Sequence, residues 1–413
     1  MADAEIIAVG SELLTPQRLD TNSLFLTEQL NGLGVEVRRK VIVGDDRALL
    51  TAAVHDALIH AEIVLLTGGL GPTEDDVTRD AVAAALGRTL VFSADLRDRL
   101  EERFRRFHRR MAENNLRQAY LVEGAEALPN ARGTAPGQWI ETDGRLILLL
   151  PGPPGELKPL FADICVPRLQ RRLPAQVIRT RLYRVAGMGE SDLDHLISPV
   201  YSKYSNPVTT ILAGAGDIQV HLRARCATGE EAERLLAEVG PPIEELLGNR
   251  LYSRNGESLE AVLGTMLRQR AATLSVAESC TGGMLGERIT GVPGSSDYFV
   301  GGFLVYTDRI KTELLGVDPA LIERHTSVSE EVARAMAEGA RSRTGSTYAI
   351  SVTGEAGPES STGAAVGTVF MGFAGPQGTD VRRAQFPGDR ARVRALATQT
   401  ALDFLRRKMG SGE

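Results

Sequence analysis

The stretch ESCTGG, residues 278–283, holds residue types that can carry out hydrolysis. It follows the apolar run ATLSVA and precedes MLGERITGV, so we expect a buried strand to end here and a helix to begin after the glycines. Amide hydrolysis needs a nucleophile, a base that takes its proton, and donors for an oxyanion. Ser279 and Cys280 are the candidate nucleophiles, and the main-chain N–H groups of the next residues are candidate oxyanion donors.

Only one of these two side chains can face the site if the strand alternation continues to its end. For Cys280 we expect a small thiol buried under the helix, because cysteines are among the most buried residues. The alternative for Ser279 is a helix cap, and a serine without a catalytic partner favours that alternative.

Few residues can serve as the base for Ser279. His325 is the single histidine between residues 255 and 413, and we expect it in a loop where a helix starts. Lys311 is the single lysine between residues 204 and 407, and the whole chain has only five lysines. A lysine partly buried in an apolar setting loses its proton more readily and can act as base to a serine. The sequence therefore favours a serine–lysine pair over a serine–histidine pair.

A second set of reactive residues lies in TGGLGPTEDDVT, residues 67–78. Its glycines let main-chain N–H groups approach an anion where a helix begins. Carboxylates beside a phosphate site usually imply a divalent cation. The carboxylates expected at the same rim are Glu12, Asp45, Asp46, Asp75 and Asp76. The pattern leaves open a plain alternative, a tight turn in which Asp75 or Asp76 caps the helix.

Alternating strands and helices position these residues in the first part of the chain. We expect strands at 5–10, 35–43, 62–67 and 145–150, and helices at 20–34 and 46–61. This alternation predicts a parallel sheet covered on both faces, whose ligands bind beyond the carboxyl ends of its strands. The segment 97–115 predicts a charged helix with inward-facing apolar residues, which are Leu96, Leu100, Phe104 and Phe107.

Length and composition predict a cytoplasmic protein of three domains. The 413 residues divide into domains at 1–172, 173–252 and 253–413, the middle one of α+β type. Hydrophobic residues make up 43% and charged residues 24%, and we find no signal-peptide pattern and no apolar run of about 18 residues, so no membrane partner is expected. The net charge of −6 argues against a nucleic-acid partner, and three scattered cysteines argue against disulfides or a zinc site.

Most of residues 5–161 resemble the molybdopterin-binding MoaB/Mog-like domain at the front of the competence/damage-inducible CinA family. The resemblance rests on blocks such as GSELL, VGDD, TGGLGPTEDDVTRD, GTAPG and LLPGPPGELKPLF. It implies a three-layer Mog-like α/β fold and hydrolysis of ADP-ribose to AMP and ribose 5-phosphate with a divalent metal ion (Mg, Mn or Co). The nucleotide-binding residues it implies are Gly10, Ser11, Asn22, Gly68, Gly69, Leu70, Gly71, Pro72, Thr73, Pro151 and Gly152; the metal-supporting residues are Asp45, Asp76, Glu12 and Asp75.

Most of residues 272–405 resemble the C-terminal domain of the same family, a PncC-type nicotinamide-nucleotide amidase of α/β fold. The blocks are AESCTGGMLGERITGV, VYTDRIK, SVTGEAGP and FPGDRARVR. The resemblance implies hydrolysis of nicotinamide mononucleotide (NMN) to nicotinic acid mononucleotide and ammonia without a cofactor. It implies Ser279 as nucleophile, Lys311 as base and Tyr306 as proton-transfer aid. Oxyanion or substrate contacts are implied for Thr281, Gly282, Gly283, Ser295, Ser296, Thr353, Gly354, Gly357 and Arg390.

The middle segment resembles the KH-like linking domain of that family. Its GMGE and GAGD stretches lack the Gly-X-X-Gly spacing of nucleic-acid-binding KH modules, so we expect a spacer or dimer contact. Together these resemblances imply a bifunctional enzyme that acts on NMN and ADP-ribose and forms a homodimer. The rival hypothesis is a competence or DNA-damage accessory protein that holds a pterin or nucleotide without turnover, and a third is an enzyme with one active domain.

Overall fold

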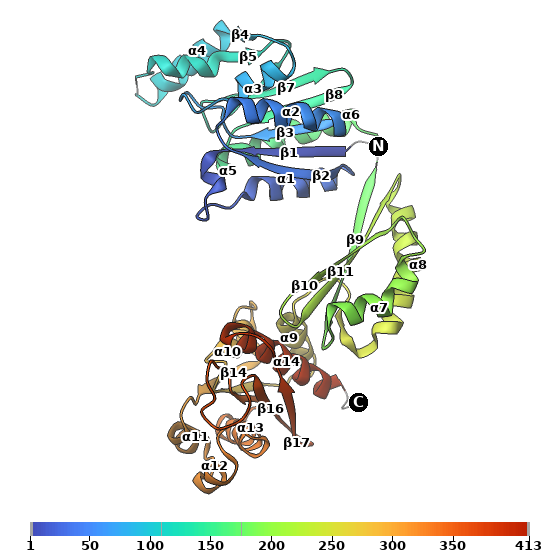
Figure 1. Ribbon diagram of the computed structural model, residues 1–413, viewed down its shortest axis with the longest axis vertical. Helices are drawn as coiled ribbons and strands as arrows, with labels where there is room; N and C mark the ends of the chain where they lie inside the picture. The colour runs from blue at the N-terminus through green and yellow to red at the C-terminus, as the bar shows by residue number, and fades with distance from the viewer. Residues whose placement is uncertain (1–2, 109, 175, 411–413) are drawn as a thin grey trace. The chain divides into compact units, whose positions relative to one another are not determined.

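The computed structural model describes residues 3–108, 110–174 and 176–410. It contains two compact units, Met1–Arg179 with Arg225–Glu233, and Thr180–Ala224 with Arg234–Glu413 (Figure 1). Each unit is described by itself.

The N-terminal unit is a six-stranded mixed sheet between two layers of helices, with a separate two-stranded ribbon. Its strands are β1 (Asp3–Val9), β2 (Glu36–Val43), β3 (Ile63–Thr67), β4 (Leu90–Phe92), β5 (Tyr120–Val122), β6 (Glu126–Leu128), β7 (Gly137–Thr142) and β8 (Arg145–Leu150). Its helices are α1 (Thr21–Gly32), α2 (Arg47–His60), α3 (Thr78–Ala85), α4 (Ala94–Arg106), α5 (Pro154–Leu160) and α6 (Val166–Arg172), with short helical turns η1 (Ser11–Leu14), η2 (Glu113–Ala119) and η3 (Phe161–Cys165).

The sheet order is β2-β1-β3-β8-β7-β6, and the first four strands are parallel, as the alternation of strands and helices predicts. Strand β7 pairs antiparallel with β8, and β6 pairs antiparallel with β7, so the fully parallel sheet of the prediction is wrong at this edge. A short hairpin connects β7 to β8, and a hairpin can join only antiparallel strands. The carboxyl ends of β2, β1, β3 and β8 meet at one edge of the sheet.

Helices cover both faces of this sheet, which explains why its central strands read as continuous apolar runs. On one face Ile7, Val64 and Leu66 pack against α2 and α3. On the other face Ile6 and Leu65 pack against α1, α5 and α6. Figure 1 shows α2 and α3 on the opposite side of the strands from α1 and α5. The three-layer arrangement leaves the edge formed by the strand ends as the place for ligands.

Helix α4 is shorter than the predicted helix over 97–115, of which residue 109 lies outside the described residues. It ends at Arg106, and the left-handed backbone of His108 (φ 52°) turns the chain away. Leu96 and Leu100 are buried as predicted. The prediction of an inward-facing Phe107 is wrong, because the helix ends before this residue and leaves its side chain 61% exposed.

The second unit contains most of a four-stranded α+β sheet of order β10-β11-β9-β12. Its elements are β9 (Val177–Ala186), α7 (Glu190–Tyr201), β10 (Val208–Ala213), β11 (Asp217–Cys226), α8 (Gly229–Leu247), η4 (Gly248–Arg250) and β12 (Leu251–Ser253). Strand β11 alternates strictly between buried and half-buried residues, which is the pattern of a sheet with one covered face. The pair Pro241–Pro242 lies inside helix α8.

The rest of the second unit is a five-stranded sheet of order β14-β13-β15-β16-β17 with helices on both faces. Its strands are β13 (Leu274–Glu278), β14 (Phe299–Leu304), β15 (Tyr348–Gly354), β16 (Thr368–Gly375) and β17 (Gly378–Gln385). Its helices are α9 (Leu259–Gln269), α10 (Met284–Thr290), α11 (Asp308–Leu315), α12 (Pro319–His325), α13 (Glu330–Thr344) and α14 (Arg390–Gly410), with the turn η5 (Ser295–Asp297). Strands β14, β13 and β15 are parallel, so their carboxyl ends meet.

The cores on the two faces of this second sheet differ in side-chain size. Leu274, Val276 and Ile350 pack against α9, α10 and α14. Smaller residues such as Ala277 and Ala349 face α11 and α13. None of the described helices has the length and apolar character needed to cross a membrane.

Candidate functional sites

The N-terminal site is built where β1, β3 and β8 end. The amide of Gly68 donates to the carbonyl of Leu150 at 3.0 Å. Gly68 has a left-handed φ of 97°, and a Cβ at this position would lie 2.3 Å from the carbonyl oxygen of Val9. A Cβ on Gly152 would lie 3.4 Å from the Cα of Gly68. The predicted nucleotide-binding residues Gly68 and Gly152 are therefore neighbours in space, and only glycine fits at Gly68.

Ser11 and Asp45 form a closed pair between the ends of β1 and β2. The amide of Ser11 donates to the Asp45 carboxylate at 2.8 Å, and the amide of Asp45 donates to Ser11 Oγ at 3.0 Å. The amide of Gly10 donates to the carbonyl of Val43, which fixes the same turn. Asp46 instead caps helix α2 by accepting from the amide of Leu49 at 2.9 Å. The two adjacent aspartates therefore have different roles: Asp46 caps helix α2, and only Asp45 faces the predicted site.

Asn22 supplies a buried acceptor at this site. Its Nδ2 atom donates to the carbonyl of Gly152 at 2.7 Å. Its Oδ1 atom is buried and accepts no hydrogen bond from any described residue. A buried polar atom without a partner is costly unless a ligand or water supplies one. This side chain is thus suited to receive a hydroxyl or amino group of a nucleotide.

The loop from Gly69 to Thr73 is held by two residues from its own flank. Asp76 accepts from the amide of Gly71 at 2.7 Å and from the amide and hydroxyl of Thr73 at 2.8 and 2.6 Å. Arg79, which is buried, donates to the carbonyls of Leu70 and Gly71 at 2.7 and 2.9 Å. Helix α3 begins at Thr78 without a side-chain cap, so the helix-cap alternative for Asp75 and Asp76 is wrong. Asp76 braces the loop instead.

The acidic residues do not form a metal-ligand set by themselves. Among residues 3–108, 110–174 and 176–410, no three histidine, cysteine, aspartate or glutamate side chains lie close enough together to hold a metal ion. Both oxygens of Asp76 already accept hydrogen bonds, and Glu12 and Asp75 are exposed. The acidic residues expected to meet at this rim therefore do not come together as a metal site. These residues fit an ion such as Mg²⁺ only if phosphate oxygens of the substrate complete its coordination together with one or two of the carboxylates.

The C-terminal site is built where β13, β14 and β15 end. The amide of Ser279 donates to the carbonyl of Val352 at 3.0 Å, and the amide of Val305 donates to that of Glu278 at 2.8 Å. Ser279 therefore lies between the ends of two neighbouring strands, and Tyr306 follows on one side. Ser279 is 8% exposed, and its Oγ atom bonds to no described residue. It is not the cap of α10, whose N-cap is Gly283.

Cys280 is a core residue, as predicted. It packs in the apolar cluster under helices α9, α10 and α14. Burial raises the pKa of its thiol to about 12, although Arg390 and Arg394 oppose the shift. A thiol that stays protonated near neutral pH is a poor nucleophile. The geometry therefore favours Ser279 over Cys280.

Glu278, which the sequence reading passed over, controls the turn that follows it. Its buried carboxylate accepts from the amides of Gly283, Leu285 and Gly286 at 3.0, 3.1 and 2.9 Å. The amide of Gly282 donates to the carbonyl of Ser279 at 3.1 Å. The amides of the two predicted glycines are therefore not available to an oxyanion in this structure. In the described part of the chain, the amides of Cys280 and Thr281 donate to no carbonyl or carboxylate.

Lys311 is buried but does not contact the serine. It lies on α11 with 2% of its surface exposed, and its Nζ atom donates to the carboxylate of Asp308 at 3.1 Å. Within the described residues no hydrogen bond joins Lys311 to Ser279. His325 is the last residue of α12, not a loop residue before a helix, and its ring lies 3.4 Å from the Glu331 carboxylate.

Tyr306 and Arg390 are linked at the mouth of the site. Arg390 donates to the hydroxyl of Tyr306 at 2.7 Å and to the carbonyl of Gly357 at 2.9 Å. Arg394, one turn along α14, donates to the carbonyl of Thr281 at 2.7 Å. The Oγ1 atom of Thr281 and the Nε atom of Arg394 are buried without a partner among the described residues. These two orphaned groups suit the polar part of a bound ligand.

The other predicted contacts divide into two groups. Thr353 and Gly354 end β15 beside Ser279, but the Thr353 hydroxyl donates to the carbonyl of Ser327 at 2.7 Å and so points into the fold. Ser295 and Ser296 lie in η5, just before the amino end of β14, which pairs with Leu274. They are at the opposite end of β13 and β14 from Ser279. Sequence proximity to a strand does not say which of its ends a loop serves.

Glu355 organises the loop that closes this edge. Its carboxylate accepts from the amides and hydroxyls of both Ser361 and Thr362, at 2.7 to 3.1 Å. Burial by itself would raise the pKa of Glu355, but the hydrogen bonds from Thr362 and Ser361 outweigh it and hold the pKa below its usual value. The loop after TGEAGP is therefore anchored to the strand end that borders the candidate active site.

The chain has the domains of a class of protein with a molybdopterin-binding-type first domain, a KH-like middle domain and a C-terminal α/β domain. The family profile described as a probable molybdopterin binding domain matches residues 5–171. The damage-inducible protein CinA KH domain matches residues 180–253, and the CinA C-terminal domain matches residues 256–409.

Similar proteins match over the full length. A CinA-like protein of Solibacter usitatus is 60% identical over 408 residues, with 98% of each chain covered. A CinA-like protein of Koribacter versatilis is 49% identical, with 98% of this chain and 99% of the relative covered. A putative competence-damage inducible protein of Symbiobacterium thermophilum is 42% identical, with 98% of each chain covered. The chain belongs to the CinA family.

Three residues at the two sites escaped the sequence reading: Arg79, Glu278 and Glu355. Each is a charged residue that proves to be buried: Glu278 ends β13, Glu355 directly follows β15, and Arg79 lies in the first turn of α3. A charged side chain inside or next to an apolar strand is a usable signal, because such a residue is almost never buried without a partner.

Proposed function

We propose that the C-terminal domain hydrolyses the carboxamide of NMN to give nicotinic acid mononucleotide and ammonia. One observation carries the proposal. The edge where β13, β14 and β15 end combines a tyrosine–arginine pair with a serine and two amides that have no hydrogen-bond partner among the described residues. A nucleophile beside donors for an oxyanion is the arrangement that acyl transfer requires.

In this proposal Ser279 Oγ attacks the carboxamide carbon, and the amides of Cys280 and Thr281 stabilise the negative oxygen that forms. The serine proton passes to a base and then to the leaving nitrogen, so ammonia departs and an acyl-enzyme remains. Water hydrolyses that ester by the same route in reverse. Arg390 and Arg394 supply guanidinium groups for the phosphate of the nucleotide.

Lys311 is the proposed base. It is buried next to the loop that carries Tyr306, and a base must be within hydrogen-bond reach of the proton it takes, directly or through one intermediate group. Since Nζ donates to Asp308 in the free protein, the proposal requires this contact to be exchanged when substrate binds. Catalytic hydrogen bonds often tighten only in the substrate complex.

Ammonia release from NMN by the purified full-length protein tests this half. We expect Ser279→Ala to lose activity by about 10³-fold or more, because the step that it removes is nucleophilic attack. The adjacent change Cys280→Ala is the matched control, and we expect it to retain turnover within about threefold. Full activity of Ser279→Ala would exclude the assigned nucleophile.

We further propose that the N-terminal domain hydrolyses ADP-ribose to AMP and ribose 5-phosphate with a divalent cation. The support is the narrow turn at Gly68 and Gly152, the unpartnered Asn22 Oδ1 atom and the neighbouring Asp45 carboxylate. The metal would be held by Asp45 together with substrate phosphates and would neutralise their charge during the displacement. Asp76 acts in this proposal by holding the loop from Gly71 to Thr73.

Chromatography of AMP formed from ADP-ribose, with Mg, Mn or Co present, tests this half. Asp45→Asn should abolish AMP formation, whereas Asp46→Asn, which removes a charge but keeps an oxygen to cap α2, should preserve it. Equal turnover by both variants would remove the metal assignment. The rival function, binding without turnover, has one observation in its favour, which is that the described part of the chain contains no preformed metal-ligand set. Calorimetry that shows tight nucleotide binding without any product would support it.

The proposal carries further expectations of the sequence that are open to measurement. They are a homodimer, a cytoplasmic location, and small nucleotides rather than nucleic acid as partners. Sedimentation of the purified chain measures the first of these directly.

A further inference from the structure

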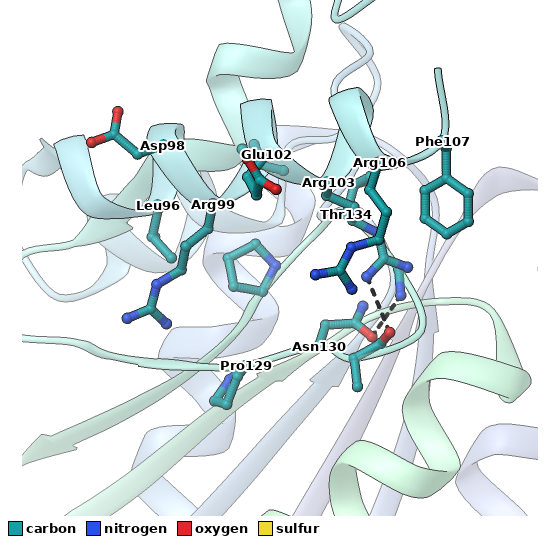
Figure 2. A pocket seen from close by; sticks show the side chains of 14 residues that line it. Leu96, Asp98, Arg99, Glu102, Arg103, Arg106, Phe107, Pro129, Asn130 and Thr134 are labelled. Atoms are coloured by element: carbon teal, nitrogen blue, oxygen red, sulfur yellow. Dashed lines mark hydrogen bonds between the residues drawn. The ribbon is translucent and has the colours of Figure 1, made fainter. Parts of the chain in front are cut away.

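A pocket of about 550 Å³ lies between helix α4 and the loop over residues 129–136 (Figure 2). None of the residues that line it belongs to the predicted nucleotide-binding or metal-supporting residues. Its volume is within the range of pockets that bind small molecules, about 300 to 1,000 Å³. The function of this pocket is therefore a separate question from ADP-ribose hydrolysis.

Three arginines of α4 line the pocket: Arg99, Arg103 and Arg106. Figure 2 shows the side chains of Arg103 and Arg106 directed toward the opposite loop at Asn130. Arg99 is paired with a carboxylate of its own helix. Arg103 donates to the carbonyl of Ala131 at 3.0 Å, and Arg106 makes no hydrogen bond or ion pair with a described residue. Two guanidinium groups thus face the pocket without a carboxylate partner.

The two acidic residues that line the pocket do not cancel this charge. Asp98 is paired with Arg97 at 2.7 Å, and Glu102 is paired with Arg105 at 2.8 Å. Neither of those arginines lines the pocket. Asp98 points away from the loop in Figure 2. The pocket therefore keeps a net positive charge suited to an anion.

An aromatic ring stands beside these arginines. Phe107 is 61% exposed, lines the pocket, and lies with its ring centroid 5.7 Å from the guanidinium carbon of Arg103. An exposed ring next to unpaired guanidinium groups is how proteins hold a planar base and the phosphate attached to it. The buried side chains of Leu96 and Leu100 supply an apolar part of the wall.

The opposite wall is rigid and offers a hydroxyl. Asn130 donates to the carbonyl of Ala135 at 2.9 Å and to the Glu156 carboxylate at 2.7 Å, and accepts from the amide of Gly133 at 2.9 Å. Thr134 Oγ1 accepts from the side chain of Gln118 at 3.1 Å, which leaves its own proton for a ligand. A wall that is already ordered binds a ligand at a lower entropic cost.

We propose that this pocket binds a nucleoside monophosphate, with its base against Phe107 and its phosphate on Arg103 and Arg106. The shape, the charge and the aromatic ring each match one part of such a ligand. The site is distinct from both hydrolytic sites and does not depend on either proposed reaction.

Calorimetric titration of the full-length protein with AMP tests the proposal. Arg106→Ala and Phe107→Leu should each weaken AMP binding by about tenfold or more, because each removes one of two principal contacts. Phe107→Trp should keep the affinity, and its fluorescence should change as AMP binds. Arg171→Ala is the matched control, since Arg171 is an exposed arginine of the same unit that does not line the pocket.

AMP is also a product of the proposed N-terminal reaction, so the titration is repeated with Asp45→Asn. Loss of AMP binding in Asp45→Asn together with unchanged binding in Arg106→Ala and Phe107→Leu would place AMP in the hydrolytic site and overturn the proposal. Inorganic phosphate that binds as tightly as AMP would reduce the pocket to an anion site and overturn the nucleotide assignment. Absence of ADP-ribose hydrolysis would leave this binding measurement unaffected.

Discussion

Replacing Glu278 by glutamine tests the central structural claim about the C-terminal site. The buried carboxylate of Glu278 accepts three main-chain amides, from Gly283, Leu285 and Gly286. The glutamine oxygen can replace only one of the two carboxylate oxygens, and its NH₂ group then opposes the amide that the other oxygen served. The change keeps the size of the side chain and removes both the charge and one acceptor.

The magnitude follows from the hydrogen bonds. A bond to a charged group contributes about 1.5 to 3 kcal/mol and a neutral bond about 0.5 to 1.5 kcal/mol, and an unsatisfied buried donor costs about 1 to 3 kcal/mol. At the low end of these ranges, one unsatisfied donor costs about 1 kcal/mol and each of two weakened bonds loses about 1 kcal/mol, which sums to about 3 kcal/mol. For a unit of this size each kcal/mol lowers the melting temperature by about 2 to 4 °C, so we expect a fall of about 6 to 12 °C.

Circular dichroism of the thermal transition and ammonia release from NMN are the two measurements. Glu287→Gln is the matched control, because it makes the same change at an exposed carboxylate of α10, the helix that follows this turn, and that carboxylate bonds to no described residue. We expect the control to melt like the wild type. The reasoning is refuted if Glu278→Gln melts within about 1 °C of Glu287→Gln, since a braced turn cannot lose an acceptor without cost.

Other residues give further expected outcomes. Because burial raises the pKa of Cys280 to about 12, iodoacetamide at about pH 8 should leave this thiol unmodified, as peptide mass spectrometry would show. Hydrogen bonding holds the pKa of Glu355 below its usual value, so its stabilisation is complete above about pH 4.5 and is lost as the pH falls through the lower folded-state pKa. The protection factor of the Thr362 amide, which is the intrinsic exchange rate divided by the measured rate at the same pH, should therefore be high at about pH 6 and fall as the pH drops through the folded-state pKa of Glu355. In Glu355→Gln it should be low throughout. Arg79→Ala leaves the carbonyls of the glycine loop without donors, and we expect it to destabilise the first unit by about 2 to 4 kcal/mol and to reduce AMP formation. An unchanged melting temperature of Arg79→Ala would show that the glycine loop keeps its conformation without the hydrogen bonds of Arg79.

The sequence by itself predicted the elements and the edges at which they place the two candidate sites. Apolar runs followed by glycines located the ends of β3 and β13, and the alternation of strands with helices predicted that such ends meet. The burial of Cys280 was also predictable, because a small apolar thiol at the end of a buried strand has few alternatives. These properties follow from local periodicity and side-chain type, which the sequence displays directly.

The tertiary structure alone decided which polar groups are free at those edges. The Glu278 carboxylate accepts the hydrogen bond of the Gly283 amide, and the Asp308 carboxylate accepts that of Lys311. The turn η5 places Ser295 at the opposite end of β13 and β14 from Ser279. Phe107 became exposed because α4 ends one residue earlier. A hydrogen-bond partner depends on groups that packing brings together from distant parts of the chain. A pattern of residue types can therefore name the candidates for a site, while only the fold determines which of them remain available to a ligand.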